Sequence, residues 1–290
     1  MKVDLYDRSR KENLNNNSVQ IVVATHKPYP MPKDTMYLPV FVGAELNVDG
    51  IKQFANSTIT PANIGEHISE KNLGFCELTA LYWAWKNISD RYIGLVHYRR
   101  HFSGPGRKRK PNDVLCFTEL QPLLNEYSIF LPKKRNYMIE SLYSHYAHTH
   151  DATHLDLTRQ IIARSFPDYL TFFDRVMEKR SGYMFNMMIM RRDLLDRYCN
   201  WLFPILFELE SLLKGDPAYE NLSSYQKRLF GRVSELLLNV WLEYEISCES
   251  IKPEEICELP WFSTERTNWI KKGSSFLSAS IFHTKYKESF

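Results

Sequence analysis

The stretch Val19-Gln20-Ile21-Val22-Val23-Ala24, followed directly by Thr25-His26-Lys27-Pro28, decides the fold. Its first six residues form an almost continuous apolar run rich in β-branched side chains, which is typical of a strand buried on both faces. The run ends before Pro28 because proline cannot continue a regular hydrogen-bonded pattern. In open α/β sheets, ligands bind beyond the carboxyl ends of the strands. We therefore expect Thr25, His26 and Lys27 to border a ligand site.

Apolar runs and amphipathic periods alternate along the rest of the chain. Further strands are predicted at residues 38–42, 92–96, 127–131 and 184–190. Helices are predicted at residues 75–87, 153–166, 192–207 and 225–244. This alternation predicts an α/β layer fold with its ligand crevice at the strand ends.

The predicted organisation is a polar leader (1–18), one main domain (19–250) and a C-terminal extension (251–290) packed on the same domain. Residues 43–72 read as a long loop, of the kind that is usually functional or mobile. Thr153 with Asp156 predicts an N-terminal helix cap. The tail after Pro253 reads as short and irregular.

Composition limits the classes of protein. The chain has 290 residues, of which 44% are hydrophobic and 14% aromatic, so it can bury a core. The net charge of +3 is too small and too dispersed for a dedicated nucleic-acid binder. Five scattered cysteines without a Cys-x-x-Cys pair argue against a disulfide framework or a structural zinc site. No apolar signal segment or membrane-spanning run is visible, so we expect a cytoplasmic protein.

The string His97-Tyr98-Arg99-Arg100-His101 follows the predicted strand at 92–96. Charged side chains at the end of a buried strand need a partner, and the arginine fork suits phosphate oxygens. Two adjacent arginines can therefore neutralise a diphosphate. The alternative is that one arginine pairs with a local carboxylate while the other faces water.

Two further polar segments can contribute to the same site. Thr25, His26 and Lys27 can grip a base, a ribose or a phosphate, although an ordinary polar loop is the commoner explanation. Lys71 and Asn72 precede the helix at 75–87 and can add to anion binding near a helix N-terminus. Simple capping is the alternative there.

One polar face of the predicted helix at 225–244 carries Arg228, Arg232, Glu235 and Asn239. If this face lines a cleft, Glu235 can act as a general base. If it faces solvent, Arg232 and Glu235 form a weak surface pair. His145, His148, His150 and His154 with Asp151 are close in sequence, but their spacing matches no zinc pattern, and no metal ligand is predicted. Asp151 and Asp156 are further acid/base candidates, with Asp156 better explained as a helix-start residue.

Six strings occur in order over about residues 19–245. They are Val23-Ala24-Thr25-His26-Lys27-Pro28-Tyr29-Pro30-Met31-Pro32, Ile68-Ser69-Glu70-Lys71-Asn72, Cys76-Glu77-Leu78-Thr79-Ala80-Leu81-Tyr82-Trp83-Ala84-Trp85-Lys86-Asn87, Gly94-Leu95-Val96-His97-Tyr98-Arg99-Arg100, Asn186-Met187-Met188-Ile189-Met190 and Gly231-Arg232-Val233-Ser234-Glu235-Leu236-Leu237-Leu238-Asn239-Val240-Trp241. Together they resemble a family of bacterial capsular and exopolysaccharide biosynthesis proteins, long labelled a domain of unknown function.

This resemblance implies a GT-A-type glycosyltransferase, with a Rossmann-like nucleotide-binding sheet flanked by helices and a helical acceptor-side region. It implies a UDP-sugar donor, with galactofuranose or another hexose as the sugar. The chain lacks the Asp-x-Asp motif that holds a divalent metal in many such enzymes, so Mn²⁺ or Mg²⁺ is not firmly predicted. In its place, Arg99 and Arg100, with Lys27 or Lys71, are expected to stabilise the leaving diphosphate.

These expectations assign roles to individual residues. Glu235 is the first candidate for the catalytic base and Asp151 the second. His150, Asn186 and Arg232 are expected on the acceptor side. Expected on the donor side are Thr25, His26, Lys27, Lys71, Asn72, His97, Tyr98, Arg99 and Arg100.

The expected acceptor is a growing, lipid-linked surface polysaccharide, reached from the inner face of the membrane. The basic segment 107–110 would then touch anionic headgroups, unless it is simply a solvated loop. Nucleic acid is not an expected partner. The alternatives in function are a non-catalytic nucleotide- or glycan-binding partner in a polysaccharide-assembly complex, and a nucleotide-sugar hydrolase.

Overall fold

A central sheet organises the chain. The computed structural model describes residues 18–54, 59–104 and 113–264. Within these ranges the sheet has nine strands, with β10-β6-β9-β4-β1-β2-β3 as its main order; β5 pairs with β4, and β11 pairs with β5. The strands are β1 (Val19–Thr25), β2 (Tyr37–Phe41), β3 (Thr60–Pro61), β4 (Tyr92–His97), β5 (Arg100–Phe102), β6 (Ile129–Pro132), β9 (Met188–Arg191), β10 (Ile256–Leu259) and β11 (Trp261–Ser263).

The strand β1 lies at the centre and is buried on both faces, as its apolar run predicts. Val22 and Ala24 belong to one core cluster, whereas Ile21 and Val23 belong to the other. Because successive side chains of a strand point to opposite faces, one unbroken apolar run supplies both cores. β1 is parallel to β2 and to β4, and β9 is antiparallel to β4 and β6. Three parallel strands, β2, β1 and β4, thus end at one edge.

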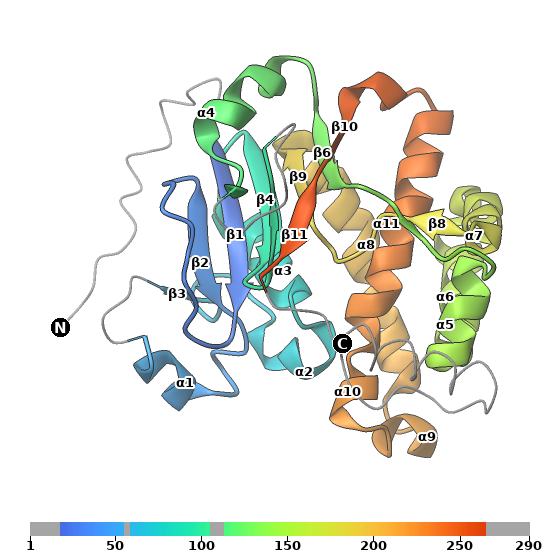
Figure 1. Ribbon diagram of the computed structural model, residues 1–290. Helices are drawn as coiled ribbons and strands as arrows, with labels where there is room; N and C mark the ends of the chain where they lie inside the picture. Colours follow the sequence, from blue (N-terminus) through green and yellow to red (C-terminus); the bar gives the residue numbers. More distant parts are fainter. Residues whose placement is uncertain (1–17, 55–58, 105–112, 265–290) are drawn as a thin grey trace.

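Helices pack against both sides of this sheet (Figure 1). They are α1 (Val48–Lys52), α2 (Asn72–Phe75), α3 (Leu78–Asn87), α4 (Phe117–Leu120), α5 (Leu142–Thr149), α6 (Thr153–Ser165), α7 (Leu170–Glu178), α8 (Arg192–Leu213), α9 (Pro217–Glu220), α10 (Ser224–Lys227) and α11 (Leu229–Ser247), with 3-10 turns η2 (Ser69–Lys71), η4 (Gln121–Asn125), η5 (Pro167–Tyr169) and η6 (Pro253–Glu255). The larger core cluster joins one sheet face to α3, α8 and α11. The α/β fold class is therefore confirmed.

A layer of helices lies beyond α11, away from the sheet. Figure 1 shows α5, α6 and α7 there, together with β8 (Ser181–Gly182), which pairs with β7 (Arg135–Asn136). The apolar faces of these helices join the same core cluster through Leu142, Ile162 and Val176. None of the helices in the described ranges is long and apolar enough to cross a membrane.

Three local predictions are wrong. Residues 256–263 are not irregular: β10 pairs with β6 and β11 pairs with β5, because the sheet edges there need hydrogen-bonding partners. The predicted helix at 225–244 is two helices, separated at Arg228, whose ψ of 25° departs from helical geometry. Thr153 and Asp156 do not form the predicted cap of α6. Instead, the Asp151 carboxylate accepts a hydrogen bond of 3.0 Å from the amide of Thr153.

Other segments differ less or lie outside the described residues. The predicted loop at 43–72 contains α1, β3 and η2. The leader up to residue 17, the basic segment 107–110 and residues 265–290 are outside the described ranges.

Candidate active site

Two adjoining cavities open where β1, β2 and β4 end. The strand-end cavity, of about 450 Å³, is lined by Ala24 and His97 of these strands and by Val42 directly after β2, with His26 and Asn72 beside them. The arginine cavity, of about 480 Å³, lies between the ends of β4 and β5 and the helices α5 and α11. Both cavities are lined by Cys76, Glu77, His97, Tyr225 and Arg228. A ligand can therefore extend from the strand ends into the helical region, at the edge where open α/β sheets bind ligands.

The arginine cavity has a positive lining. Five arginines contribute to it: Arg99, Arg100, Arg135, Arg228 and Arg232. Three glutamates also line it: Glu77, Glu140 and Glu235. Because arginine keeps its charge even when buried, the excess of cations favours an anionic ligand.

Hydrogen bonds hold the two arginines on the helical side of the cavity, Arg228 and Arg232, in place. The Arg232 guanidinium donates to the carbonyl of Tyr225 at 2.6 Å and to that of Gln226 at 3.3 Å. Nε of Arg228 donates to Sγ of Cys76 at 3.0 Å. Burial, followed by the charge of Arg99, lowers the pKa of Arg100, while Glu235 and Glu77 oppose this shift. The Arg100 guanidinium also lies 4.6 Å from the centroid of the Phe185 ring.

Glu235 is the titratable group best placed for proton transfer. Burial, with a smaller effect from Glu77, raises the pKa of Glu235 to about 7, and the charge of Arg100 opposes the shift. A carboxylate with a pKa near the working pH can both accept and release a proton. Glu77 faces the same cavity and accepts a bond of 2.9 Å from Nδ2 of Asn186. These two carboxylates therefore differ in environment, which is typical of groups with different roles.

Two histidines of the arginine cavity, the half-buried His97 and the buried His150, are held neutral. Burial, followed by the charges of Arg99 and Arg100, lowers the pKa of His97 to about 2. Nδ1 of His97 accepts a bond from the amide of Arg99 at 3.3 Å, so its Nε2 carries the proton. Burial, followed by Arg232, lowers the pKa of His150 to about 3, and its Nδ1 donates to Oε1 of Gln226 at 2.9 Å. His97 can therefore donate a hydrogen bond and His150 can accept one.

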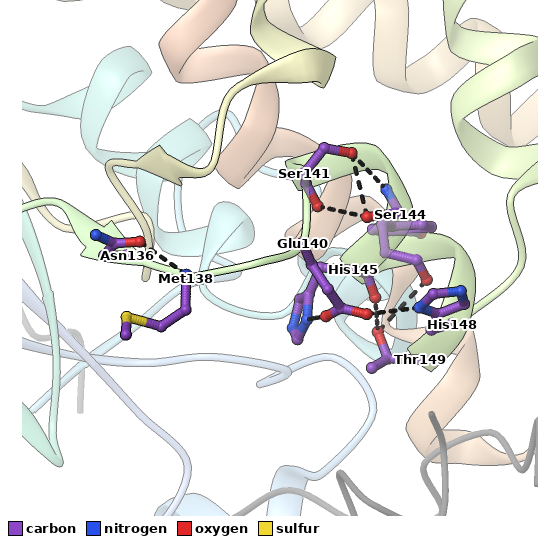
Figure 2. Close-up of polar contacts among 9 residues, drawn as sticks. Asn136, Met138, Glu140, Ser141, Ser144, His145, His148 and Thr149 are labelled. Atoms are coloured by element: carbon purple, nitrogen blue, oxygen red, sulfur yellow. Dashed lines mark hydrogen bonds and ion pairs between the residues drawn. The ribbon is translucent and has the colours of Figure 1, made fainter. Parts of the chain in front are cut away.

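A second polar group borders the arginine cavity on α5. The Glu140 carboxylate contacts Nδ1 of His145 at 2.7 Å and Nδ1 of His148 at 2.6 Å (Figure 2). Burial alone would raise the pKa of Glu140, yet the hydrogen bonds from His148 and His145 hold that pKa below its usual value. Within the described ranges, no group of three or more His, Cys, Asp or Glu side chains could hold a metal ion.

Backbone strain also concentrates at this site. Five non-glycine residues in the described ranges have positive φ, and three of them, Cys76, Met138 and Phe185, line the arginine cavity. A fourth, Asn186 with φ 50°, lies directly behind its wall. Such conformations cost roughly 1–3 kcal/mol each and cluster at functional sites.

The structure brings eight of the predicted site residues to the two cavities. They are His26, Asn72, His97, Arg99, Arg100, His150, Arg232 and Glu235. Asn186 stands behind the wall, where Nδ2 also donates to the carbonyl of Gly231 at 2.9 Å and Oδ1 accepts from Ser234 at 2.8 Å. It therefore positions Glu77 and α11 rather than facing the cavity.

The other predicted residues line neither cavity. Tyr98 is buried, and its ring lies 5.1 Å from Nζ of Lys27 and 5.5 Å from the guanidinium of Arg99, so it orients neighbouring cations. The Thr25 hydroxyl donates to the carbonyl of Lys27 at 2.7 Å and closes the turn. Lys71 pairs with Glu210 at 2.6 Å. The Asp151 carboxylate accepts from the amide of Thr153 at the start of α6.

Sequence reasoning missed several cavity residues, among them Glu77, Arg135 and Glu140. Glu77 directly precedes α3, and the sequence alone does not distinguish it from a helix-capping residue. The left-handed conformation of Cys76, with φ 51°, turns the chain there and is not encoded by a glycine. The long reach from residue 77 to residue 186 is visible only in the folded chain.

The fold is similar to that of a solved protein. The structure of the apo form of WbbM, a bifunctional glycosyltransferase, matches this chain with a TM-score of 0.72 and 27% identity. The match covers 86% of this chain and 46% of that one, so this chain spans less than half the length of WbbM. No significant match was found among curated proteins.

The fold is thus that of the GT-A-like glycosyltransferases: a mostly parallel sheet flanked by helices, with the cavities at the strand ends. The chain belongs to the family described as Domain of unknown function (DUF4422), whose profile matches residues 20–246.

Proposed function

We propose that this chain is a glycosyltransferase that moves a hexose from a UDP-sugar to a hydroxyl group of a glycan acceptor. The observation that carries the proposal is Glu235: its pKa is raised to about 7, and it lines a cavity rich in arginine beside the strand ends. The likeness in fold to a bifunctional glycosyltransferase supports this chemistry. Galactofuranose is one candidate for the sugar.

The nucleotide would occupy the strand-end cavity, near His26, Asn72 and His97. Its diphosphate would then lie at the junction of the two cavities, within reach of Arg99, Arg100 and Arg228. Because these cations are fixed before the reaction, they would stabilise the charge that develops on the leaving UDP.

The acceptor would occupy the helical side of the arginine cavity, near His150 and Arg232. Glu235 would accept the proton of the acceptor hydroxyl while the oxygen of that hydroxyl bonds to the anomeric carbon of the donor sugar. The bond between that carbon and the phosphate oxygen would break, and UDP would leave with the bonding electrons. General-base help of this kind contributes about 10²–10⁴-fold to the rate.

The proposed acceptor is lipid-linked, and the proposed place of action is the cytoplasmic face of the membrane. A capsular, exopolysaccharide or lipopolysaccharide chain would fit this acceptor class. A non-catalytic binding partner remains the second candidate, since arginine cavities also bind anions without turnover. It predicts UDP or glycan binding with no UDP release above background.

The test is calorimetric titration of the purified protein with UDP, GDP and CMP, with and without Mn²⁺. We expect metal-independent UDP binding that is lost in the Arg99→Ala/Arg100→Ala variant. The matched control is Arg159→Ala/Arg175→Ala, since Arg159 and Arg175 line neither cavity. Absence of binding to all three nucleotides would overturn the proposal.

Turnover is measured as UDP release from UDP-sugars with and without a glycan acceptor. Acceptor-dependent release supports a transferase. Release that is equally fast without acceptor would instead identify a nucleotide-sugar hydrolase.

A further inference from the structure

We propose that the strap, defined as residues 133–139, docks the protein on an anionic lipid bilayer with the mouth of the arginine cavity turned toward the lipid surface. The inference rests on the proposed function for its purpose, because a lipid-linked acceptor must be met at a bilayer. The binding itself needs neither nucleotide nor turnover.

The strap presents two adjacent apolar side chains to solvent. Ile139 is 80% exposed and Met138 is 73% exposed, which are the two highest values among large apolar side chains in the described ranges. The Asn136 side chain accepts a bond of 2.8 Å from the amide of Met138, whose φ is 62° (Figure 2). A hydrogen-bonded turn in a left-handed conformation therefore fixes the exposed pair in place.

Three exposed cations lie on the strap and on the segment bonded to it. Lys133 and Lys134 begin the strap, and both are exposed. Arg180 lies alongside, because the amide of Tyr137 donates to its carbonyl at 2.8 Å. In the described part of the chain, no carboxylate forms an ion pair with these three side chains. An apolar tip with exposed cations on the same strap and on the adjoining segment complements a surface with anionic headgroups over an acyl interior.

The strap is anchored at both ends. At its start the amide of Lys133 donates to the carbonyl of Leu259 at 3.2 Å, and β7 pairs with β8. At its end Glu140 is buried between His145 and His148, and Ser141 caps α5 by accepting from the amide of Ser144 at 3.0 Å. Figure 2 shows this anchor on α5 beside the turn at Met138. Because the strap is already ordered, docking loses little conformational freedom.

The position of the strap connects docking to the proposed chemistry. Met138 and Arg135 line the arginine cavity, so the strap forms part of its rim. Two apolar side chains are too few for a stable protein interface, which needs about 800 Å² from each partner. They are enough for a bilayer, where apolar insertion adds to the attraction of several cations. The observations therefore favour a lipid surface over a protein partner.

The experiment is a vesicle partition assay with the full chain. Vesicles of phosphatidylglycerol and phosphatidylcholine are compared with vesicles of phosphatidylcholine alone. We expect binding to the anionic vesicles, and a loss of roughly tenfold or more in Met138→Ser/Ile139→Ser from the lost apolar burial. Lys133→Gln/Lys134→Gln/Arg180→Gln should bind about 100-fold more weakly, at about fivefold for each charge.

The matched control is Val48→Ser/Ile64→Ser, which removes two exposed apolar side chains on the α1 and β3 side of the sheet, far from the strap in Figure 1. It should bind vesicles like the parent protein, and thermal melting should show that each variant folds. No binding of the parent to anionic vesicles, or equal binding by Met138→Ser/Ile139→Ser, would overturn the proposal. Calorimetry with UDP on the same samples separates this result from the proposed function, because UDP binding does not depend on whether the strap binds vesicles.

Discussion

The strand-end wall and the helical wall of the arginine cavity are assembled in different ways. The strand-end wall, formed by His97, Arg99 and Arg100, comes from one continuous string at the end of β4 and the start of β5. The helical wall, formed by His150, Arg232 and Glu235, comes from two helices, and its His150–Gln226 bond joins residues 76 positions apart. The first wall is thus placed by strand pairing alone, whereas the second requires the helices to dock.

The two walls also differ in chemistry. Arg99 and Arg100 lie against the rings of Tyr98 and Phe185, so they offer charge to a ligand. Glu235 on the helical wall titrates near neutral pH. This difference teaches that binding of the leaving group and activation of the acceptor can be separated by substitution, one wall at a time.

The largest expected effect comes from Glu235→Gln. This variant removes the proposed base while keeping the size of the side chain, so turnover should fall by about 10²–10⁴-fold. UDP affinity should stay within about twofold, because the strand-end wall that binds UDP is untouched. Acceptor-dependent UDP release and calorimetry measure the two effects.

The control for this variant is Glu243→Gln. Glu243 lies on the same helix α11 but forms an ion pair with Lys179 and lines neither cavity. It should leave turnover unchanged. Full turnover in Glu235→Gln would remove Glu235 from the proposed mechanism.

The next largest effect is expected for Arg228→Ala, since Arg228 lines both cavities. Losing one charge-assisted contact costs about 1.5–3 kcal/mol, so UDP should bind roughly 10–100-fold more weakly. Turnover should fall as well, and the accompanying loss of UDP affinity would distinguish Arg228 from Glu235. Calorimetry that finds unchanged UDP affinity would place the diphosphate away from the junction of the cavities.

A smaller effect is expected from pH. A base must be deprotonated to accept a proton, so turnover should be low below the pKa of Glu235 and rise to a plateau above about 7. At about one pH unit below that pKa, the rate should be roughly tenfold below the plateau. A pH profile that is flat between about 5.5 and 8.5 in the presence of saturating substrate would contradict the role of Glu235.

The smallest effect is expected for Lys71→Ala. Lys71 lies outside both cavities and pairs with Glu210, so its loss should cost less than about 1 kcal/mol of stability. UDP affinity should not change. A marked loss of UDP binding in calorimetry would return Lys71 to the donor site predicted from the sequence.

Much of this protein could be predicted from its sequence. The apolar run at β1, the amphipathic periods and the strand-end string at 97–101 each record a local physical requirement, so they indicated the α/β fold and the strand-end wall. Glu235 could be placed on the polar face of a helix, but its exposure depended on whether that face met a cavity or solvent.

Only the tertiary structure decided which of those residues share a site. Glu77 contacts Asn186, which is 109 positions away in the chain. Arg228 lies between two helices and lines both cavities, and Glu140 contacts two histidines of α5. Local sequence determines secondary structure because backbone bonding and side-chain alternation act over a few residues. The placement of charges around a cavity follows instead from long-range packing, and that packing raises the pKa of Glu235 through burial.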